Sequence, residues 1–241
     1  MNEVSHSLDR LAAADDRLLA TATALSDAQA REPSLLPGWS RGHVLTHIAR
    51  NADGMVNLLR WARTGAQIPM YASAQSRAAD IEAGAGRPAS DLAADVRESA
   101  AALAAEAASM PDEAWTAQVR ALNGPPFPAL GVLERRLSEV EIHHVDVAAR
   151  YSPGDWPGDF VSEALPRVAG SFAGRDDVPP FVARADGARD SFQLGPERAG
   201  PPAVIIHGEP ADLLAWLLGR GDGARLALAR GDALPELPPW R

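Results

Sequence analysis

Long alanine- and leucine-rich segments with helical periodicity occupy the first 150 residues and constrain the fold more than any other feature. Apolar residues recur three and four positions apart, which is typical of helices that bury one face. Short connections with glycine and proline separate the segments, and such connections favour antiparallel neighbours. We predict an up-down bundle of four helices, at residues 5–30, 41–64, 89–110 and about 131–150.

The sequence changes character near "YSPGDWPGD", residues 151–159. Beyond this stretch, short strand-like segments alternate with turn signals, and two segments retain helical periodicity. We therefore predict the α+β class, with a four-helix bundle domain at residues 1–152 and a small α+β domain at residues 153–241. The expected strands lie within 180–186, 191–195, 202–208 and 224–231, and the expected helices near 160–174 and 208–220.

The chain contains no cysteine and no lysine, so all 23 of its Lys and Arg residues are arginines. Without cysteine there are no disulfides, no thiolate metal ligands and no sulfur nucleophile of the protein's own. Without lysine, Schiff-base chemistry and the P-loop lysine are excluded. Histidine, carboxylates, serine, arginine and whatever the protein binds remain available for chemistry.

The net charge of −9 and the absence of a basic stripe predict no nucleic-acid partner. No apolar run reaches the length of a membrane span, and the first residues are polar and acidic, unlike a signal peptide. We expect a cytoplasmic protein with no membrane association and no obligatory protein partner.

The stretch "SEVEIHHVD" places two histidines side by side on the fourth predicted helix. Neighbouring helical residues point about 100° apart, so the two belong to different faces. His144 falls on an apolar stripe and is expected in the core. His143 falls on a charged stripe with Glu139, four residues earlier, so the two side chains can reach one point. An ordinary Glu–His ion pair on a solvated face remains the alternative.

The second predicted helix places His43, His47 and Asn51 beside its apolar stripe. Helical bundles hold metals by projecting Glu and His inward from facing helices. Two histidines and one carboxylate with an open position are the ligand set of catalytic zinc and of non-haem iron sites. Spacing alone leaves open whether His43 or His47 contributes.

Three stretches, "GWSRGHVLTHI", "MYASAQSRAADIE" and "SEVEIHHVD", resemble the mycothiol-dependent maleylpyruvate isomerases of the DinB-like metalloenzyme superfamily. The resemblance extends to the closing "ADLLAWLLGRGDG" and "LPELPPW", and so covers nearly the whole chain. The first element is shared by many DinB-like proteins, whereas the full ordered set points to the isomerase subgroup. It implies a DinB-like bundle at the N-terminus.

The resemblance implies a zinc ion held by His47, Glu139 and His143. It leaves His43 as a packing residue or a support for a ligand. It also places Arg77 and Arg220 near the site, as groups that bind the substrate or the thiol; surface charges are the alternative for both. Asp146 lies on the same stripe as the ligands, either supporting one of them or as a surface charge.

The implied activity is a zinc- and mycothiol-dependent cis–trans isomerisation of maleylpyruvate to fumarylpyruvate, in gentisate-type aromatic breakdown. A thiolate adds to the double bond, the resulting single bond rotates, and elimination restores the alkene. The expected partners are a small dicarboxylate and a low-molecular-weight thiol, mycothiol, because the chain has no sulfur nucleophile of its own. Arg77 and Arg220 are the candidates for binding carboxylates.

Two alternatives remain at this point. A mycothiol S-transferase would use the same metal and thiol on another electrophile, and would yield a stable thioether. A non-catalytic zinc-binding regulatory module would bind either no metal or a metal with four protein ligands and no open position.

Overall fold

The computed structural model describes residues 3–122, 124–188, 191–197, 200 and 202–240. The chain divides into two compact units, Met1–Tyr151 and Ser152–Arg241, and each is described by itself. The first is almost entirely helical and the second combines two α-helices with a sheet, which confirms the predicted α+β class. No helix in the described ranges is long and apolar enough to cross a membrane.

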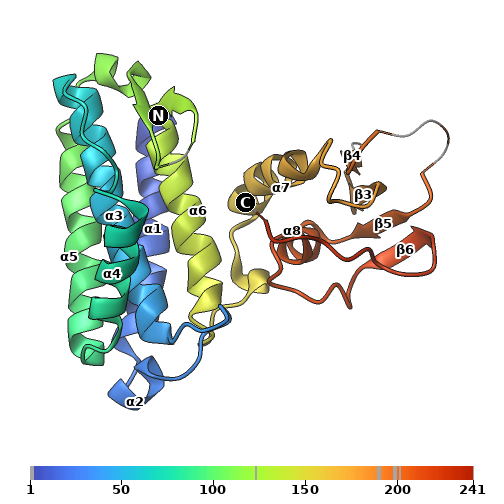
Figure 1. Cartoon of the computed structure of the whole chain (residues 1–241), viewed down its shortest axis with the longest axis horizontal. Helices are drawn as coiled ribbons and strands as arrows, with labels where there is room; N and C mark the ends of the chain where they lie inside the picture. Colours follow the sequence, from blue (N-terminus) through green and yellow to red (C-terminus); the bar gives the residue numbers. More distant parts are fainter. Residues whose placement is uncertain (1–2, 123, 189–190, 198–199, 201, 241) are drawn as a thin grey trace. The chain divides into compact units, whose positions relative to one another are not determined.

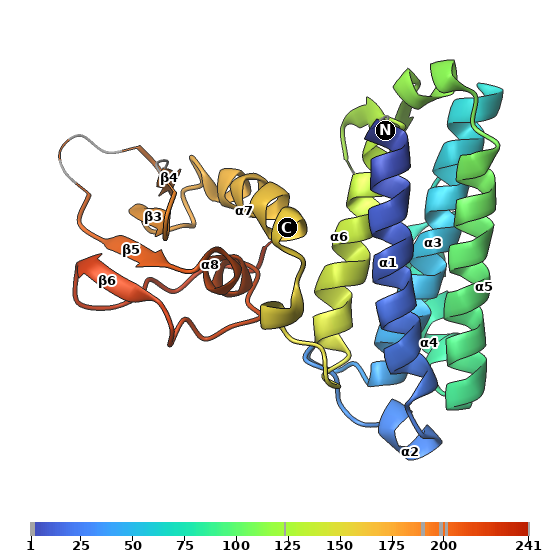
Figure 2. The ribbon, with the colours of Figure 1, turned by 180° about the vertical axis from the view of Figure 1, so that it is seen from behind.

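Four long helices make up the bundle of the first unit (Figures 1 and 2). The third helix along the chain, α3, packs against α4, α5 and α6, and α1 packs against α5 and α6. Their apolar faces meet in a core rich in Leu, Ile, Val and Ala. The elements are α1 (Glu3–Thr23), α2 (Asp27–Ala30), α3 (Arg41–Thr64), α4 (Ala74–Ala85), α5 (Ala89–Ala108), η1 (Asp112–Thr116), β1 (Gln118–Arg120), β2 (Pro126–Pro128) and α6 (Gly131–Asp146).

Two predicted helix limits are wrong. The helix expected at residues 5–30 ends at Thr23, and Ser26 starts the separate helix α2 by accepting a hydrogen bond from the backbone N–H of Gln29. The fourth helix ends at Asp146 rather than Arg150, because Ala148 adopts a left-handed conformation with φ of 55°. The apolar pattern continues past both ends. The N-cap Ser26 begins a new helix in the first place, and the left-handed residue Ala148 ends the helix in the second.

The helix α4 was not predicted, because its sequence is rich in small and polar residues. It begins at the N-cap Ser73, which exchanges hydrogen bonds with Ser76. It lies unusually close to α3: a Cβ atom at Gly42 would collide with the carbonyl oxygen of Ala85, and one at Gly84 would lie 2.5 Å from Thr46 Cγ2. These two glycines therefore allow α4 to pack directly against the N-terminal half of α3.

The stripe of α6 predicted to be dominated by charge is largely buried. Arg136 is fully buried and donates from Nη1 to the carbonyl of Ile48 at 2.8 Å and to Oδ1 of Asn51 at 3.1 Å. Its Nη2 lies 3.4 Å from the carboxylate of Asp15 on α1. One buried guanidinium thus connects α6 with α3 and α1, and its polar partners offset the cost of burying the charge.

The second unit places two helices on a four-stranded sheet of order β4-β3-β5-β6. In this sheet β3 and β5 pair in parallel, whereas β3 with β4 and β5 with β6 pair antiparallel. The helix α7 packs against β4 and α8, and α8 packs against β3 and β5. The elements are η2 (Pro153–Asp155), α7 (Gly158–Phe172), β3 (Phe181–Ala185), β4 (Ser191–Leu194), β5 (Ile205–Gly208), α8 (Pro210–Leu217) and β6 (Ala227–Arg230).

Candidate functional site

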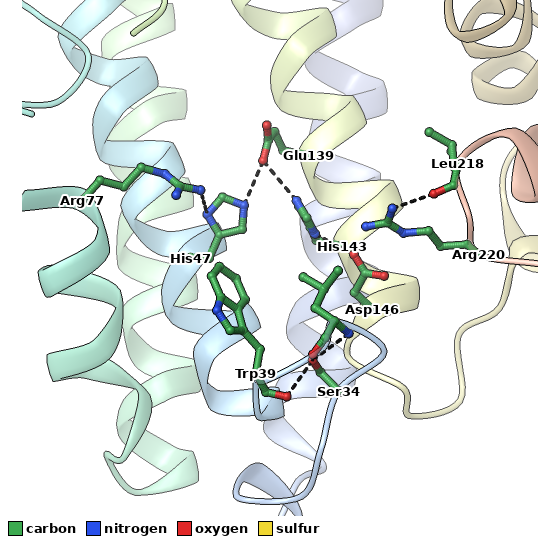
Figure 3. Close-up of polar contacts among 10 residues, drawn as sticks. Ser34, Trp39, His47, Arg77, Glu139, His143, Asp146, Leu218 and Arg220 are labelled. Carbon is green, nitrogen blue, oxygen red and sulfur yellow. Dashed lines mark hydrogen bonds and ion pairs between the residues drawn. The ribbon is translucent and has the colours of Figure 1, made fainter. Parts of the chain in front are cut away.

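Three side chains from the two facing helices α3 and α6 converge at one point in the bundle (Figure 3). His47 Nε2 lies 3.1 Å from Glu139 Oε2, and His143 Nε2 lies 3.5 Å from the same oxygen. The two imidazole rings meet edge to face, with centroids 4.5 Å apart. The structure therefore brings together all three residues named as ligands by the resemblance.

The arrangement of these donor atoms fits a divalent metal ion. The three atoms lie within 4.8 Å of one another. Donors bound at about 2.0–2.2 Å to a tetrahedral ion lie about 3.3–3.5 Å apart, close to the separations of both histidines from Glu139. Three protein donors leave a fourth position for an added ligand, and the side chain of Glu139 is 33% exposed, so such a ligand can approach.

Asp146 orients His143 from the side opposite the cluster. Its carboxylate lies 2.7 Å from His143 Nδ1, which leaves Nε2 directed at Glu139. Asp146 is fully buried, and its carbonyl accepts a hydrogen bond from the N–H of Leu35 at 3.0 Å. The structure thus excludes the surface-charge alternative for Asp146 and places it as a carboxylate partner of a candidate ligand.

Arg77 orients His47 in a different way. Arg77, on α4, lies with Nη2 2.9 Å from His47 Nδ1 (Figure 3). Because a guanidinium only donates, Nδ1 accepts this hydrogen bond, and in the metal-free site the ring proton is on Nε2, facing Glu139. Burial lowers the pKa of His47, so this ring is neutral at physiological pH.

The two histidines differ in charge because their surroundings differ. Burial opposes protonation of His143, yet hydrogen bonds to Asp146 and Glu139 raise its pKa to about 9. Burial likewise opposes ionisation of Glu139, but the hydrogen bonds from His143 and His47 hold its pKa well below the usual range. The metal-free site thus contains an ionised Glu139 between one protonated and one neutral histidine, and a metal ion would displace protons from both imidazole Nε2 atoms.

Two residues beside the cluster, Trp39 and His43, have structural roles that spacing did not predict. His43 Nδ1 accepts hydrogen bonds from the backbone N–H of Ser40 at 3.2 Å and from its hydroxyl, which completes the cap of α3. Its Nε2 lies 3.2 Å from Glu82, on α4. The indole of Trp39 stacks on His43 at 6.0 Å and meets the edge of His47 at 5.6 Å, so it forms an aromatic wall next to the cluster.

A model of the mycothiol maleylpyruvate isomerase N-terminal domain matches residues 11–148 of the chain, more than half of it, and a model of the MDMPI C-terminal domain matches residues 155–239. The chain belongs to the mycothiol maleylpyruvate isomerase family. The three clustered residues all lie within the first of these matches.

Solved structures support the same assignment over the whole chain. The chain is similar to the crystal structure of the mycothiol-dependent maleylpyruvate isomerase, with 27% identity, a TM-score of 0.88, and coverage of 99% of this chain and 98% of that one. A histidine-to-alanine mutant of that enzyme gives the same TM-score and coverage with 26% identity. A search of curated protein sequences found no match. Family and structures confirm the prediction of an enzyme of the isomerase class.

His144 and Arg220 complete the placement of the residues singled out in the sequence. His144 is buried, stacks on Tyr151 with ring centroids 3.8 Å apart, and lies 2.7 Å from the hydroxyl of Thr21, as expected of a core residue. Arg220 belongs to the second unit, where Nη1 donates to the carbonyl of Leu218 at 2.7 Å. The role predicted for Arg220 at the cluster stays a prediction.

The metal-free protein should show a pH-dependent contribution of His143 to stability. A pKa raised from 6.5 to about 9 stabilises the fold fully below about pH 6.5, and this contribution is lost as the pH rises through about 9. Its upper bound is about 3.5 kcal/mol, since one pKa unit corresponds to about 1.4 kcal/mol. Urea unfolding with a chelator present should therefore show Asp146→Asn destabilised more at pH 6 than at pH 10. An equal difference at both pH values would contradict this coupling.

Proposed function

We propose that the chain is a zinc- and mycothiol-dependent cis–trans isomerase that converts maleylpyruvate to fumarylpyruvate, in gentisate-type aromatic breakdown. The convergence of His47, Glu139 and His143, in a chain that matches both domains of the isomerase family, is the observation that supports it most directly. The substrate and the thiol are inferred from the names of the family and of its solved members.

We propose His47, Glu139 and His143 as the ligands of the zinc ion. The donor set of two imidazoles and one carboxylate is that of catalytic zinc sites. A zinc ion at this position would lower the pKa of a coordinated thiol enough to present it as a thiolate at neutral pH. Asp146 holds His143 in the orientation that directs Nε2 to the site, and Glu139 supplies the single negative charge among the donors.

Mycothiol would supply the sulfur that adds to the double bond and leaves again after rotation about the resulting single bond. The chain has no cysteine that could take this role. The protein must therefore bind the thiol and the substrate together and hold the alkene beside the sulfur, where positioning contributes much of the acceleration.

Arg77 is suited to bind a carboxylate of the substrate. A metal held at Nε2 of His47 requires the ring proton at Nδ1, where the Arg77 guanidinium can no longer donate. Arg77 would then be free to donate to an anion beside the cluster, as a dicarboxylate substrate requires. Arg220 is proposed for the same substrate or for the thiol, on the basis of the family resemblance alone.

Arg77→Met and Arg220→Met should each lower kcat/KM about ten- to a hundredfold at saturating zinc. This is the effect of losing one charge-assisted hydrogen bond, about 1.5–3 kcal/mol. Zinc content, measured by elemental analysis, should match wild type in both variants. Unchanged kcat/KM in both would show that neither arginine binds substrate or thiol.

Product analysis tests the proposed function directly. Purified zinc-loaded protein with mycothiol and maleylpyruvate should yield fumarylpyruvate, followed by chromatography or NMR, with the thiol concentration unchanged. A stable thioether with loss of thiol would instead establish an S-transferase. Neither product, with zinc verified in the protein, would refute both activities.

Three further proposals concern the domain boundaries, the cellular location and the partners of the protein. The domains are proposed at residues 1–152 and 153–241. A cytoplasmic location stays a prediction, as does the absence of a nucleic-acid partner or an obligatory protein partner.

A further inference from the structure

Tyr71, in the connection between α3 and α4, packs its ring against α3 at a glycine. A Cβ atom at Gly54 would lie 3.1 Å from Cε1 of Tyr71 and 2.9 Å from Met70 Cγ. A residue without a side chain at position 54 leaves this space on the buried face of α3. The ring is thereby held against the helix that also provides His47, two turns away.

Arg77 places Tyr71 near the cluster. The guanidinium carbon of Arg77 lies 5.6 Å from the centre of the Tyr71 ring, and its Nη2 lies 2.9 Å from His47 Nδ1. One arginine is therefore shared between the phenol and a proposed metal ligand.

Asn51 and Arg136 form a buried polar layer one helical turn from His47 and Glu139. Asn51 follows His47 by four residues on α3, and Arg136 precedes Glu139 by three on α6. Arg136 donates to Asn51 Oδ1 at 3.1 Å, and an arginine cannot accept, so the amide oxygen of Asn51 is fixed on this side. The NH2 group of Asn51 is consequently available to donate on the other side, and Asn51 lowers the pKa of Tyr71.

Arg77 and Asn51 both lower the pKa of Tyr71, Arg77 through its charge and each as a hydrogen-bond donor would. No acceptor for the O–H proton of Tyr71 is found within the described ranges, so the hydroxyl can donate this proton to a bound ligand. Burial raises the pKa of Tyr71, with a smaller contribution from the charge of Glu139, so the hydroxyl stays protonated at neutral pH.

We propose that the Tyr71 hydroxyl donates a hydrogen bond to the substrate carbonyl oxygen that becomes an enolate during isomerisation. This role rests on the proposed function. When the thiolate adds, its lone pair forms the C–S bond, the π pair of the alkene shifts, and the carbonyl oxygen receives the negative charge. After rotation, elimination returns this pair to the alkene and releases the thiolate, so Tyr71 retains its proton throughout.

The geometry suits this role because a donor fixed in advance stabilises charge most where water is excluded. The close contact at Gly54 holds the ring of Tyr71 against α3 before substrate arrives. Arg77 supplies positive charge on the same side, which strengthens the phenol as a donor. Tyr71 would thus be a catalytic residue that sequence spacing did not reveal.

The chain offers a matched control, since it contains only two tyrosines, Tyr71 and Tyr151. Tyr151 donates to Glu141 and stacks on His144, so Tyr151→Phe removes a hydroxyl bonded inside the core. Tyr71→Phe should lower kcat about ten- to a hundredfold, which reaches up to the lower end of the range for one oxyanion donor. Its zinc content and unfolding midpoint should match wild type. Tyr151→Phe should keep wild-type kcat relative to its folded fraction.

A second measurement separates donation from packing. In the Tyr151→Phe background, fluorinated tyrosine incorporated throughout the chain labels position 71 alone. A phenol of lower pKa should shift the loss of kcat at alkaline pH to lower pH, in step with that pKa. A residue that only packs would leave the pH profile unchanged.

The outcomes distinguish this proposal from the proposed function. If wild-type protein does not isomerise maleylpyruvate, the proposed function fails and the role of Tyr71 fails with it. If wild type isomerises and Tyr71→Phe retains full kcat, or if the fluorinated proteins keep the wild-type pH profile, only the role of Tyr71 is overturned.

Discussion

His143→Ala should lose tight zinc binding, whereas His144→Ala, one residue along the same helix, should retain about one zinc ion per chain. The reason is geometric: His143 Nε2 points to Glu139 and His47, while His144 points to Thr21 and stacks on Tyr151. Losing a residue that merely supports a ligand costs about 10–100-fold in metal affinity, so loss of a ligand should cost more than about 100-fold. His47→Ala should behave like His143→Ala.

Elemental analysis after gel filtration, together with competition against a chelator of known affinity, measures this difference. His144→Ala is expected to unfold at lower urea concentration, because it leaves a cavity in the core beside Tyr151. Zinc content should therefore be compared in folded protein, verified by circular dichroism. Normal zinc in His143→Ala together with none in His144→Ala would reverse the assignment of the two histidines.

Omitting the thiol should reduce the rate of maleylpyruvate isomerisation to the spontaneous rate. The chain has no cysteine, so the nucleophilic sulfur must come from solution. Three protein donors would leave a position on a bound metal ion where a thiol could bind as its thiolate. Mycothiol should give the highest rate, since binding of its sugar portion helps to position the sulfur.

The measurement uses protein freed of thiols by gel filtration, with its zinc content verified afterwards. Isomerisation is then followed with no thiol, with mycothiol and with a small thiol lacking the sugar. Protein stripped of zinc by a chelator serves as the control for thiol acting alone. Full turnover by zinc protein without any thiol would eliminate the addition–elimination mechanism and mycothiol as cofactor.

Periodicity was sufficient to predict the bundle and the i,i+4 relation of Glu139 to His143. It could also separate His143 from His144, because adjacent residues on a helix face different neighbours. It could not choose between His43 and His47, since both border the same stripe. That choice depends on the capping role of His43 Nδ1, which is set by the loop before α3. The identity of the third residue came from the family resemblance.

The burial of the polar residues was harder to predict from the sequence. Arg136 and Asp146 lie on a stripe that looks solvated in isolation, yet both are fully buried. Both depend on partners distant in sequence. Arg136 is bonded to Ile48 and Asn51, and Asp146 is bonded to the loop at Leu35. Tyr71 was overlooked for the same reason, because its contacts with Gly54 and Arg77 arise only when α4 packs on α3.

The glycines at the contact of α3 and α4 should tolerate substitution poorly. Gly42 and Gly84 have no functional group, yet any side chain at either position must push α4 away from α3. Arg77 would move with α4, away from His47. In a saturation screen for activity, both glycines should therefore rank with the residues that perform chemistry. Compensating changes should appear on the facing helix, at residues such as Thr46, rather than among the ligands. Laboratory evolution toward new substrates would have to shift this helix by altering its contact surface, since the contact itself leaves no free volume.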